Sequence, residues 1–218
     1  MNKTIHNVGF LFDLDGVIID SESQYTKIWT QINQEFPTGV DNLAIIIKGC
    51  TLPKILNDYY PEDEVKEKVS HRLHELENQM KYEYLPAAKE FLEELVSRNL
   101  PTALVTSSDN TKMKHLWEEL PDIRKYFDFI ITGDLVKTSK PSPEGYLLGA
   151  SKLNIDPKNC VVFEDSLQGV MAGKNAGAFV IGVAGTLPSE KLQPYANIII
   201  NRFDELDLDA LILKVKYR

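Results

Sequence analysis

The chain has 218 residues, of which 43% are apolar and 26% charged, the composition of a globular protein that buries a hydrophobic core. Its length suits one large domain, or a medium-sized domain with a smaller insert. The formal net charge of -8 argues against nucleic-acid binding, because a phosphate backbone requires clustered Lys and Arg residues, and the sequence has no basic run. An acidic chain that handles an anionic ligand would need a metal ion or a few well-placed donors.

Cysteine usage and the apolar runs bear on where the protein works. Cys50 and Cys160 are far apart and neither belongs to a Cys-x-x-Cys pair, which predicts buried thiols in a reducing compartment. Asp13 interrupts the apolar stretch at residues 8–14, so this stretch does not resemble a secretory signal. No run approaches the roughly 20 apolar residues that span a bilayer. We therefore expect a cytoplasmic protein without a membrane partner and, because no long apolar patch is evident, a monomer.

The first elements are a strand and then a long helical stretch. Residues 8–12 form a short continuous apolar run, typical of a strand buried on both faces, which ends at Asp13. Residues 21–83 show no strand pattern, which predicts an all-α insert. Ser21 and Gln24 have the spacing of a capping box at its start. Apolar positions at helical spacing, or a closing glycine, mark helices at residues 25–36, 41–48 and 65–80.

Strands and helices alternate after Pro86. The predicted strands are residues 102–105, 129–131, 161–163, 179–183 and 198–200, and the predicted helices are 88–99, 110–120, 143–153, 167–176 and 206–215. Such alternation implies right-handed crossovers and a parallel sheet with helices on both faces. We therefore expect an α/β, Rossmann-like core made of residues 1–20 and 84–218, with residues 21–83 as a separate helical cap.

Polar side chains follow four of the predicted strands. They are Asp13 and Asp15 after the first strand, Thr106 and Ser107 after the second, Lys140 after the third, and Glu164 and Asp165 after the fourth. Ligands of open parallel sheets bind beyond the carboxyl ends of the strands, so these side chains are expected to converge.

The residue types in this set suit phosphoryl transfer. Two facing acidic pairs repel each other unless they share a cation, and a hard divalent ion such as Mg²⁺ suits Asp13, Asp15 and Asp165. This ion and Lys140 would offset the charge of a phosphate, whose oxygens the Thr106 hydroxyl and nearby amides would hold. Asp13 could then attack the phosphorus and form an acyl phosphate. Asp15 could protonate the leaving oxygen and later deprotonate a water molecule.

Each motif also has a purely structural reading. An Asp-x-Asp sequence at a strand end is often a surface loop, and residues 106–109 and 164–166 could only cap the helices that follow them. Residues 139–141 could be a solvated loop. The occurrence of all four motifs in order, on successive strand ends, favours the site over these separate readings.

Other candidate motifs are weaker. Residues 169–174 resemble a P-loop, but the spacing is short and Asn175 stands where Ser or Thr belongs, so a helix packed close to the sheet is expected. No Gly-x-Gly-x-x-Gly follows the first strand, which argues against a nicotinamide cofactor. His71 and His74 lie on a charged helix and are expected to be solvated, and Cys50 has no evident base.

The set of motifs resembles that of the haloacid dehalogenase-like hydrolase superfamily. The matching segments are Asp13-Leu14-Asp15-Gly16-Val17, Thr106-Ser107, Lys140-Pro141 and Phe163-Glu164-Asp165-Ser166-x-x-Gly169. The chain looks most similar to the β-phosphoglucomutase and phosphoglycolate phosphatase branch, which carries a helical cap after the first motif. The resemblance implies that Asp13 is the nucleophile and Asp15 the general acid and base, and that Thr106 and Lys140 hold the phosphate. It also implies that Asp13, the backbone carbonyl of Asp15, and Asp165 bind Mg²⁺, with Glu164 nearby.

Departures from the branch bear on the reaction. Its phosphomutases carry a cap Arg just after a Lys-Gly pair, whereas Cys50 follows Lys48-Gly49 here, and Tyr25 replaces a His of the first cap helix. Both differences favour hydrolysis, and Lys48 and Tyr25 are the candidates for substrate contact from the cap. Asp15 argues against carbon–halogen cleavage, because the dehalogenases of the superfamily lack it.

Three hypotheses follow. The preferred one is a Mg²⁺-dependent phosphatase of a small metabolite, such as a sugar phosphate or a phosphoglycolate-like compound. The alternative is a β-phosphoglucomutase-like phosphomutase. The third is a phospho-acceptor signalling domain, which places its phosphorylated Asp on a later strand and has no need of a helical cap.

Overall fold

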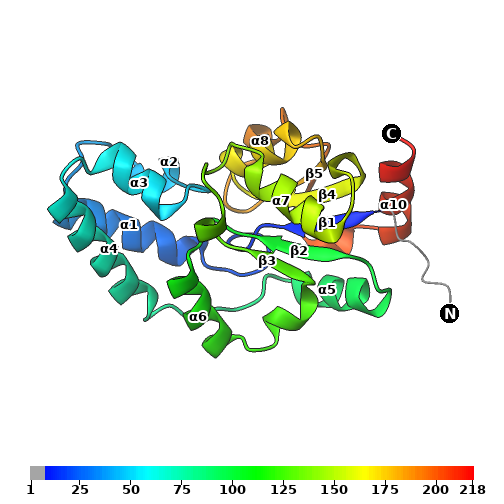
Figure 1. The fold of residues 1–218 in the computed structure, drawn as a ribbon, viewed down its shortest axis with the longest axis horizontal. Coiled ribbons are helices and arrows are strands. Elements are labelled where there is room, and N and C mark those ends of the chain that lie inside the picture. Colours follow the sequence, from blue (N-terminus) through cyan, green and yellow to red (C-terminus); the bar gives the residue numbers. More distant parts are fainter. Residues whose placement is uncertain (1–7) are drawn as a thin grey trace.

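The computed structural model describes residues 8–218, so residues 1–7 of the expected core lie outside the described part. Six parallel strands form one sheet in the order β3-β2-β1-β4-β5-β6. The strands are β1 (Gly9–Phe12), β2 (Thr102–Val105), β3 (Phe129–Ile131), β4 (Cys160–Glu164), β5 (Phe179–Val183) and β6 (Ile198–Ile200). This sheet confirms the expected α/β class (Figure 1).

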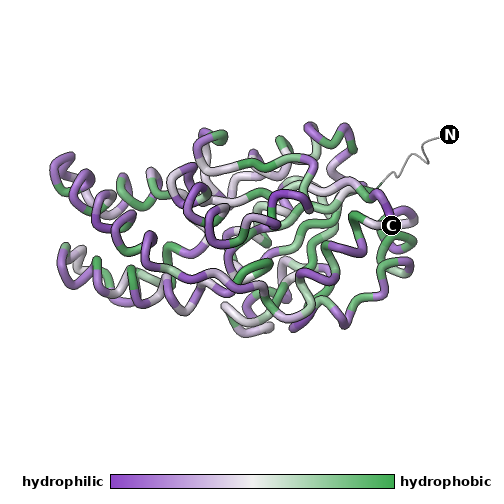
Figure 2. The backbone as a smooth tube through the Cα atoms, turned by 90° about the horizontal axis from the view of Figure 1, so that it is seen from below, coloured by the Kyte–Doolittle hydropathy of each residue, from purple (hydrophilic) through white to green (hydrophobic). Residues whose placement is uncertain are grey.

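Helices cover both faces of the sheet because successive strand side chains point to opposite sides. Phe10 and Phe12 face one hydrophobic core, which includes side chains of α5 (Ala88–Ser97), α6 (Asn110–Glu119) and α10 (Leu208–Lys216). Leu11 faces a second core with α7 (Glu144–Leu153) and α8 (Leu167–Asn175). Figure 2 shows the apolar residues concentrated in the strands and the hydrophilic ones on the outer helices.

Four helices separate β1 from the rest of the core. They are α1 (Glu22–Glu35), α2 (Leu43–Ile46), α3 (Leu52–Tyr59) and α4 (Asp63–Glu77). They lie together beyond the carboxyl end of β1, on the left in Figure 1. The chain leaves and returns at one place, where the Asp20 N–H donates to the Glu83 carbonyl at 2.9 Å and the Leu85 N–H to the Ile18 carbonyl at 2.9 Å. The helical segment is therefore joined to the sheet through two adjacent connections.

Local details of this segment differ from the sequence expectation. The helix expected over residues 41–48 is only the four residues of α2, because Asn42 before it and Gly49 after it both have left-handed backbone angles (φ 57° and 77°). The capping box is wrong as well. The Ser21 hydroxyl donates to Asp15 and makes no bond to the helix, and the Gln24 amide donates to the Lys81 carbonyl at 2.7 Å.

The remaining elements are short and lie in the core. They are α9 (Ser189–Leu192) and 3₁₀ turns at Ile123–Tyr126, Gly133–Leu135, Pro157–Asn159 and Phe203–Glu205. The helix expected over residues 206–215 starts at Leu208, because the Asp207 carboxylate caps it by accepting from the Ala210 N–H at 3.0 Å. Within residues 8–218, none of the helices has the length and apolar character that crossing a bilayer requires.

Candidate active site

The sheet topology brings the ends of β1 and β4 together. The chain runs from β1 outward to β2 and β3, and then returns to β4 on the other side of β1. Such a reversal opens a crevice at the carboxyl ends of the two central strands. Asp13 follows β1 there, and its N–H donates to the Phe163 carbonyl of β4 at 3.0 Å. The acidic residues after these two strands are therefore neighbours.

Lys140 lies between two buried carboxylates. Its Nζ is 2.5 Å from Asp13 Oδ1 and 2.5 Å from Glu164 Oε1, and the lysine is only 7% exposed. Burial raises the pKa of Asp13 to about 7, although Lys140 opposes the rise. Burial alone would lower the pKa of Lys140, but Asp13 and Glu164 raise it, so the ammonium stays charged. The structure thus joins three of the expected strand-end motifs in one ion-paired cluster.

The Glu164 carboxylate accepts hydrogen bonds from several donors. Besides Lys140, its carboxylate accepts from the Tyr146 hydroxyl at 2.8 Å and from the N–H groups of Asp165 and Ser166 at 3.1 and 3.2 Å. Gly169 leaves room for this carboxylate, because a Cβ there would be 1.7 Å from Glu164 Oε1. A carboxylate with so many donors is well suited to fixing the position of Lys140.

Asp165 differs from Glu164 in its hydrogen bonding. Its Oδ2 is buried and has no hydrogen-bond partner among the described residues. Burial, and next to it Glu164, raises the pKa of Asp165 well above the usual range. Oxygens of Asp13, Glu164 and Asp165 lie within 4.8 Å of one another, and Gly16 leaves space beside Asp165, since a Cβ there would be 2.0 Å from Oδ2. An unpartnered buried oxygen in an acidic, all-oxygen set fits a hard divalent cation.

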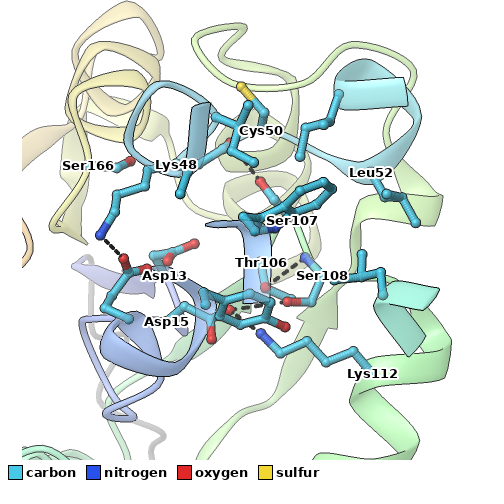
Figure 3. Close-up of a pocket in the computed structure, with 18 of the residues that line it drawn as sticks. Asp13, Asp15, Lys48, Cys50, Leu52, Thr106, Ser107, Ser108, Lys112 and Ser166 are labelled. Atoms are coloured by element: carbon cyan, nitrogen blue, oxygen red, sulfur yellow. Dashed lines mark hydrogen bonds and ion pairs between the residues drawn. The ribbon is translucent and has the colours of Figure 1, made fainter. Parts of the chain in front are cut away.

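Asp15 lies outside this cluster, and three side chains bind its carboxylate. The Ser21 hydroxyl donates to Oδ1, while the Ser108 hydroxyl and Lys112 Nζ donate to Oδ2 at 3.2 and 2.5 Å. Lys112 is 3% exposed, and its ammonium lies 4.3 Å from the centre of the Tyr25 ring. Figure 3 shows Lys112 reaching Asp15 from α6.

Lys112 is a residue of this site that was not predicted from the sequence. Asp109 caps α6 by accepting from the N–H groups of Thr111 and Lys112, which places Lys112 in the first turn of the helix, beside the Thr106 loop. A lysine in the first turn of a helix that follows a candidate phosphate loop is the signal that could have identified it, because a cation is electrostatically unfavourable at a helix N-terminus.

Two loops of the core, one after β2 and one after β3, form hydrogen bonds with the helical segment. Thr106 is 5% exposed, and its hydroxyl accepts from the backbone N–H two residues on at 3.0 Å. The Ser107 hydroxyl donates to the Gly49 carbonyl at 2.9 Å, and the Ser139 hydroxyl accepts from the Thr51 N–H at 2.8 Å. The hydroxyl of Ser107, which was expected to contact phosphate, is therefore already bonded to the helical segment.

Both expected cap residues line the pocket, each with an acidic partner that the sequence did not indicate. The Lys48 ammonium is ion-paired with Glu22, and the Tyr25 hydroxyl donates to Glu77 Oε1 at 2.6 Å. Burial raises the pKa of both acids, while Lys48 opposes the rise for Glu22 and Lys112 does so for Glu77. Pairs between distant helices carry no local sequence signal.

The pocket lies between the strand ends and the helical segment and has a volume of about 110 Å³. This is room for a few water molecules or one compact organic group. Its polar floor includes Asp13, Asp15 and Thr106, as Figure 3 shows. Its apolar wall comes from the helical segment: Trp29, Ala44, Ile47, Leu52, Ile55 and Leu73.

Of the expectations for the other candidate motifs, some are correct and some are wrong. Residues 169–174 belong to α8, and Gly173 packs closely on β4 and β5, as expected of a helix against the sheet. His71 is solvated, with a side chain 77% exposed. The expectation for His74 is wrong, because it is 26% exposed and its Nε2 is 3.0 Å from Asp109 Oδ2. The thiols of Cys50 and Cys160 are free, with Cys160 buried.

Comparisons with known proteins agree with the fold. The family described as haloacid dehalogenase-like hydrolase matches residues 10–183. A phosphorylated carbohydrates phosphatase of Thermotoga maritima is 35% identical over 77% of this chain and 80% of its own length. Hexitol phosphatase A of Escherichia coli is 28% identical over 91% and 92%. The crystal structure of β-phosphoglucomutase from Clostridium difficile superposes with a TM-score of 0.78 at 27% identity, covering 95% of this chain and 96% of that one.

These similarities and the parallel-sheet fold define a phosphoric monoester hydrolase. The chain belongs to the haloacid dehalogenase-like hydrolase family, in its β-phosphoglucomutase branch.

Proposed function

We propose that this phosphatase hydrolyses a small phosphorylated metabolite, such as a sugar phosphate, through an aspartyl-phosphate intermediate on Asp13, with Mg²⁺ as its cofactor. The observation that carries the proposal is the cluster at the crevice, where Asp13 is 2.5 Å from the Lys140 ammonium and beside the unpartnered oxygen of Asp165. A carboxylate next to fixed positive charge is suited to attack a phosphate that would otherwise be repelled.

Asp13 and Asp165 are the side chains that would hold the cation, together with the backbone carbonyl of Asp15. When bound, Mg²⁺ supplies positive charge that offsets the charge on the phosphate oxygens. We assign Glu164 to fixing Lys140, because its oxygens are already occupied by donors. Thr106 and the amide of Ser107 would hold the remaining phosphate oxygens.

In the first half-reaction, an oxygen of Asp13 forms a bond to phosphorus and the bond from phosphorus to the ester oxygen breaks. Asp15 donates its proton to the departing alcohol oxygen. In the second half-reaction Asp15 takes a proton from water, whose oxygen attacks the phosphorus and releases inorganic phosphate. Asp13 is then a free carboxylate again.

The helical segment, residues 21–83, is proposed to act as a cap over the core of residues 1–20 and 84–218. Its support is the pocket between the two parts, together with the contacts Ser107–Gly49 and Ser139–Thr51 across it. A cap would exclude water while the acyl phosphate forms.

The test is a screen of phosphorylated metabolites with Mg²⁺, in which released inorganic phosphate is measured with and without a chelator. We expect turnover that a chelator abolishes and added Mg²⁺ restores. Activity that is indifferent to chelation would remove the metal assignment. The alternative is a phosphomutase, which the similarity to β-phosphoglucomutase supports. It would be established if the phosphate moved within the substrate, if a bisphosphate were required and if no free phosphate were released.

A further inference from the structure

The pocket is rich in negative charge, and its cations are already paired. Its acidic lining residues are Asp13, Asp15, Glu22, Glu77, Asp109 and Asp165. In the described part of the chain, the basic residues that line it are Lys48 and Lys112. Lys48 is ion-paired with Glu22, and Lys112 with Asp15 at 2.5 Å. Neither ammonium is available to a second anionic group of a substrate without breaking an existing pair.

Within residues 8–218, Glu77 forms no ion pair with a lysine or arginine, although Lys112 lowers its pKa from a distance. It is 6% exposed and its Oε1 accepts from the Tyr25 hydroxyl at 2.6 Å, whereas its Oε2 is 4.0 Å from His74 Nε2. That histidine nitrogen is closer to Asp109, at 3.0 Å. Glu77 Oε2 is thus an acceptor with spare capacity on the part of the pocket wall that the helical segment forms.

The surroundings of Glu77 strengthen its effect. Trp29, Ile55 and Leu73 line the same pocket and are buried. Charges interact more strongly where apolar walls exclude water, so a second carboxylate or phosphate in this space would be repelled strongly. A hydroxyl or ammonium group would instead gain a charge-assisted hydrogen bond.

We propose that this pocket selects phosphomonoesters whose alcohol part carries hydrogen-bond donors and no second negative charge, and that Glu77 accepts the hydrogen bond of that donor. The inference rests on the proposed phosphatase activity of the same site. It favours neutral sugar and polyol phosphates, and it disfavours sugar bisphosphates and phosphorylated acids, phosphoglycolate among them.

The experiment compares substrates that differ in one terminal group. Sorbitol 6-phosphate ends in a hydroxymethyl group where 6-phosphogluconate ends in a carboxylate, and fructose 1-phosphate lacks the second phosphate of fructose 1,6-bisphosphate. We expect kcat/KM to be about 10- to 100-fold higher for the first member of each pair, because a second anionic group is repelled by Glu77 in a pocket whose apolar walls exclude water. Equal or higher kcat/KM for the doubly anionic members would overturn the proposal.

Two variants assign the effect to Glu77. Glu77→Gln keeps the shape and an acceptor for Tyr25 but removes the charge, so the preference should shrink by about fivefold or more. Glu75→Gln is the matched control, because Glu75 lies on the same helix with its side chain 47% exposed and does not line the pocket. An unchanged preference in a folded Glu77→Gln protein would reject Glu77 as the selecting residue.

Assays with p-nitrophenyl phosphate distinguish failure of the specificity inference from failure of the proposed phosphatase function. If the protein hydrolyses this ester but shows no preference within the pairs, the specificity inference fails and the phosphatase proposal stands. If neither this ester nor any sugar phosphate is hydrolysed with Mg²⁺, the proposed function itself fails, and the specificity inference fails with it. The preference of the wild-type protein tests the inference even if Glu77→Gln does not fold.

Discussion

Two aspartates separated by one residue have different surroundings in this protein. Asp13 is buried against Lys140, and Asp15 is held by Ser21, Ser108 and Lys112. Alternate residues of a strand share a face, but the chain bends at Leu14 and turns at Gly16 (φ 73°), so one carboxylate can face the acidic cluster while the other faces the helical segment. This division fits the separate roles of nucleophile and proton donor that we propose.

Replacing Asp13 by Asn tests the nucleophile. The amide keeps the shape but cannot form the acyl phosphate, so phosphate release should fall by more than about 10⁴-fold, as when a covalent nucleophile is removed. Thermal unfolding should remain cooperative, because the change removes a buried charge and not packing. Appreciable turnover in a preparation free of contaminating phosphatases would contradict the role.

Replacing Asp15 by Asn tests the proton donor. The rate should fall by about 10²- to 10⁴-fold for alkyl phosphates, the usual contribution of general acid catalysis. The loss should be smaller for p-nitrophenyl phosphate, since its leaving group needs little protonation. An equal loss for both kinds of ester, measured as kcat/KM, would show that Asp15 acts in another way.

At the scale of elements, the first turn of α8 positions the carboxylate of Glu164 and, through it, Lys140. Ser166 caps this helix by accepting from the Gly169 N–H at 3.0 Å, and the absence of a side chain at Gly169 lets Glu164 lie against the first turn. Glu164 in turn binds Lys140. A helix terminus thus determines the position of a lysine on a different loop.

Gly169→Ala should therefore be destabilising, although Gly to Ala within a helix ordinarily stabilises by about 0.5–1 kcal/mol. The new methyl group would displace Glu164, at a cost of about 1–3 kcal/mol, as for other overpacked sites. Lys174→Ala, on the exposed side of the same helix, should change the free energy of unfolding by less than about 0.5 kcal/mol. Denaturant unfolding measures both variants, and a Gly169→Ala protein at least as stable as the parent would refute the packing argument.

At the scale of the whole molecule, the buried carboxylates of the site lower the free energy of unfolding when no cation is bound. The unfolded chain titrates Asp13 near 3.8, whereas burial raises the folded pKa to about 7, against the opposing effect of Lys140. The folded protein therefore holds a proton on Asp13 that the unfolded chain loses as pH rises from about 4 to about 7, so the metal-free protein loses stability across this range. Asp165, whose pKa is also raised by burial, acts in the same direction.

Mg²⁺ should stabilise the folded protein more at pH 8 than at pH 5, because protons compete for the same oxygens at low pH. At 100 times its Kd the cation would add about 2.7 kcal/mol, or roughly 5–10 °C in Tm for a chain of this size. Thermal unfolding with and without Mg²⁺ at both pH values measures the effect. Asp13→Asn is the control and should lose most of it; a Tm shift that is the same at both pH values would contradict the competition.

The success of sequence reasoning followed how local each signal is. The strand at residues 8–12 and the polar residues that follow it were evident because apolar runs and turn residues occupy adjacent positions. The capping box at Ser21 and Gln24 failed because both side chains bond to residues outside the helix, Asp15 six positions away in the sequence and Lys81 57 positions away. A polar group brought close by the tertiary fold can compete with a local cap for the same side chain.

The sequence by itself determined the parallel α/β class and the order of Asp13, Thr106, Lys140 and Glu164 on successive strand ends, because periodicity and turn chemistry are written locally. Only the tertiary structure decided the partners of those groups. It joined Lys112 to Asp15 across 97 positions and Tyr25 to Glu77 across 52. Pairings over such separations depend on how helices pack around a shared pocket, and this information belongs to the folded chain as a whole.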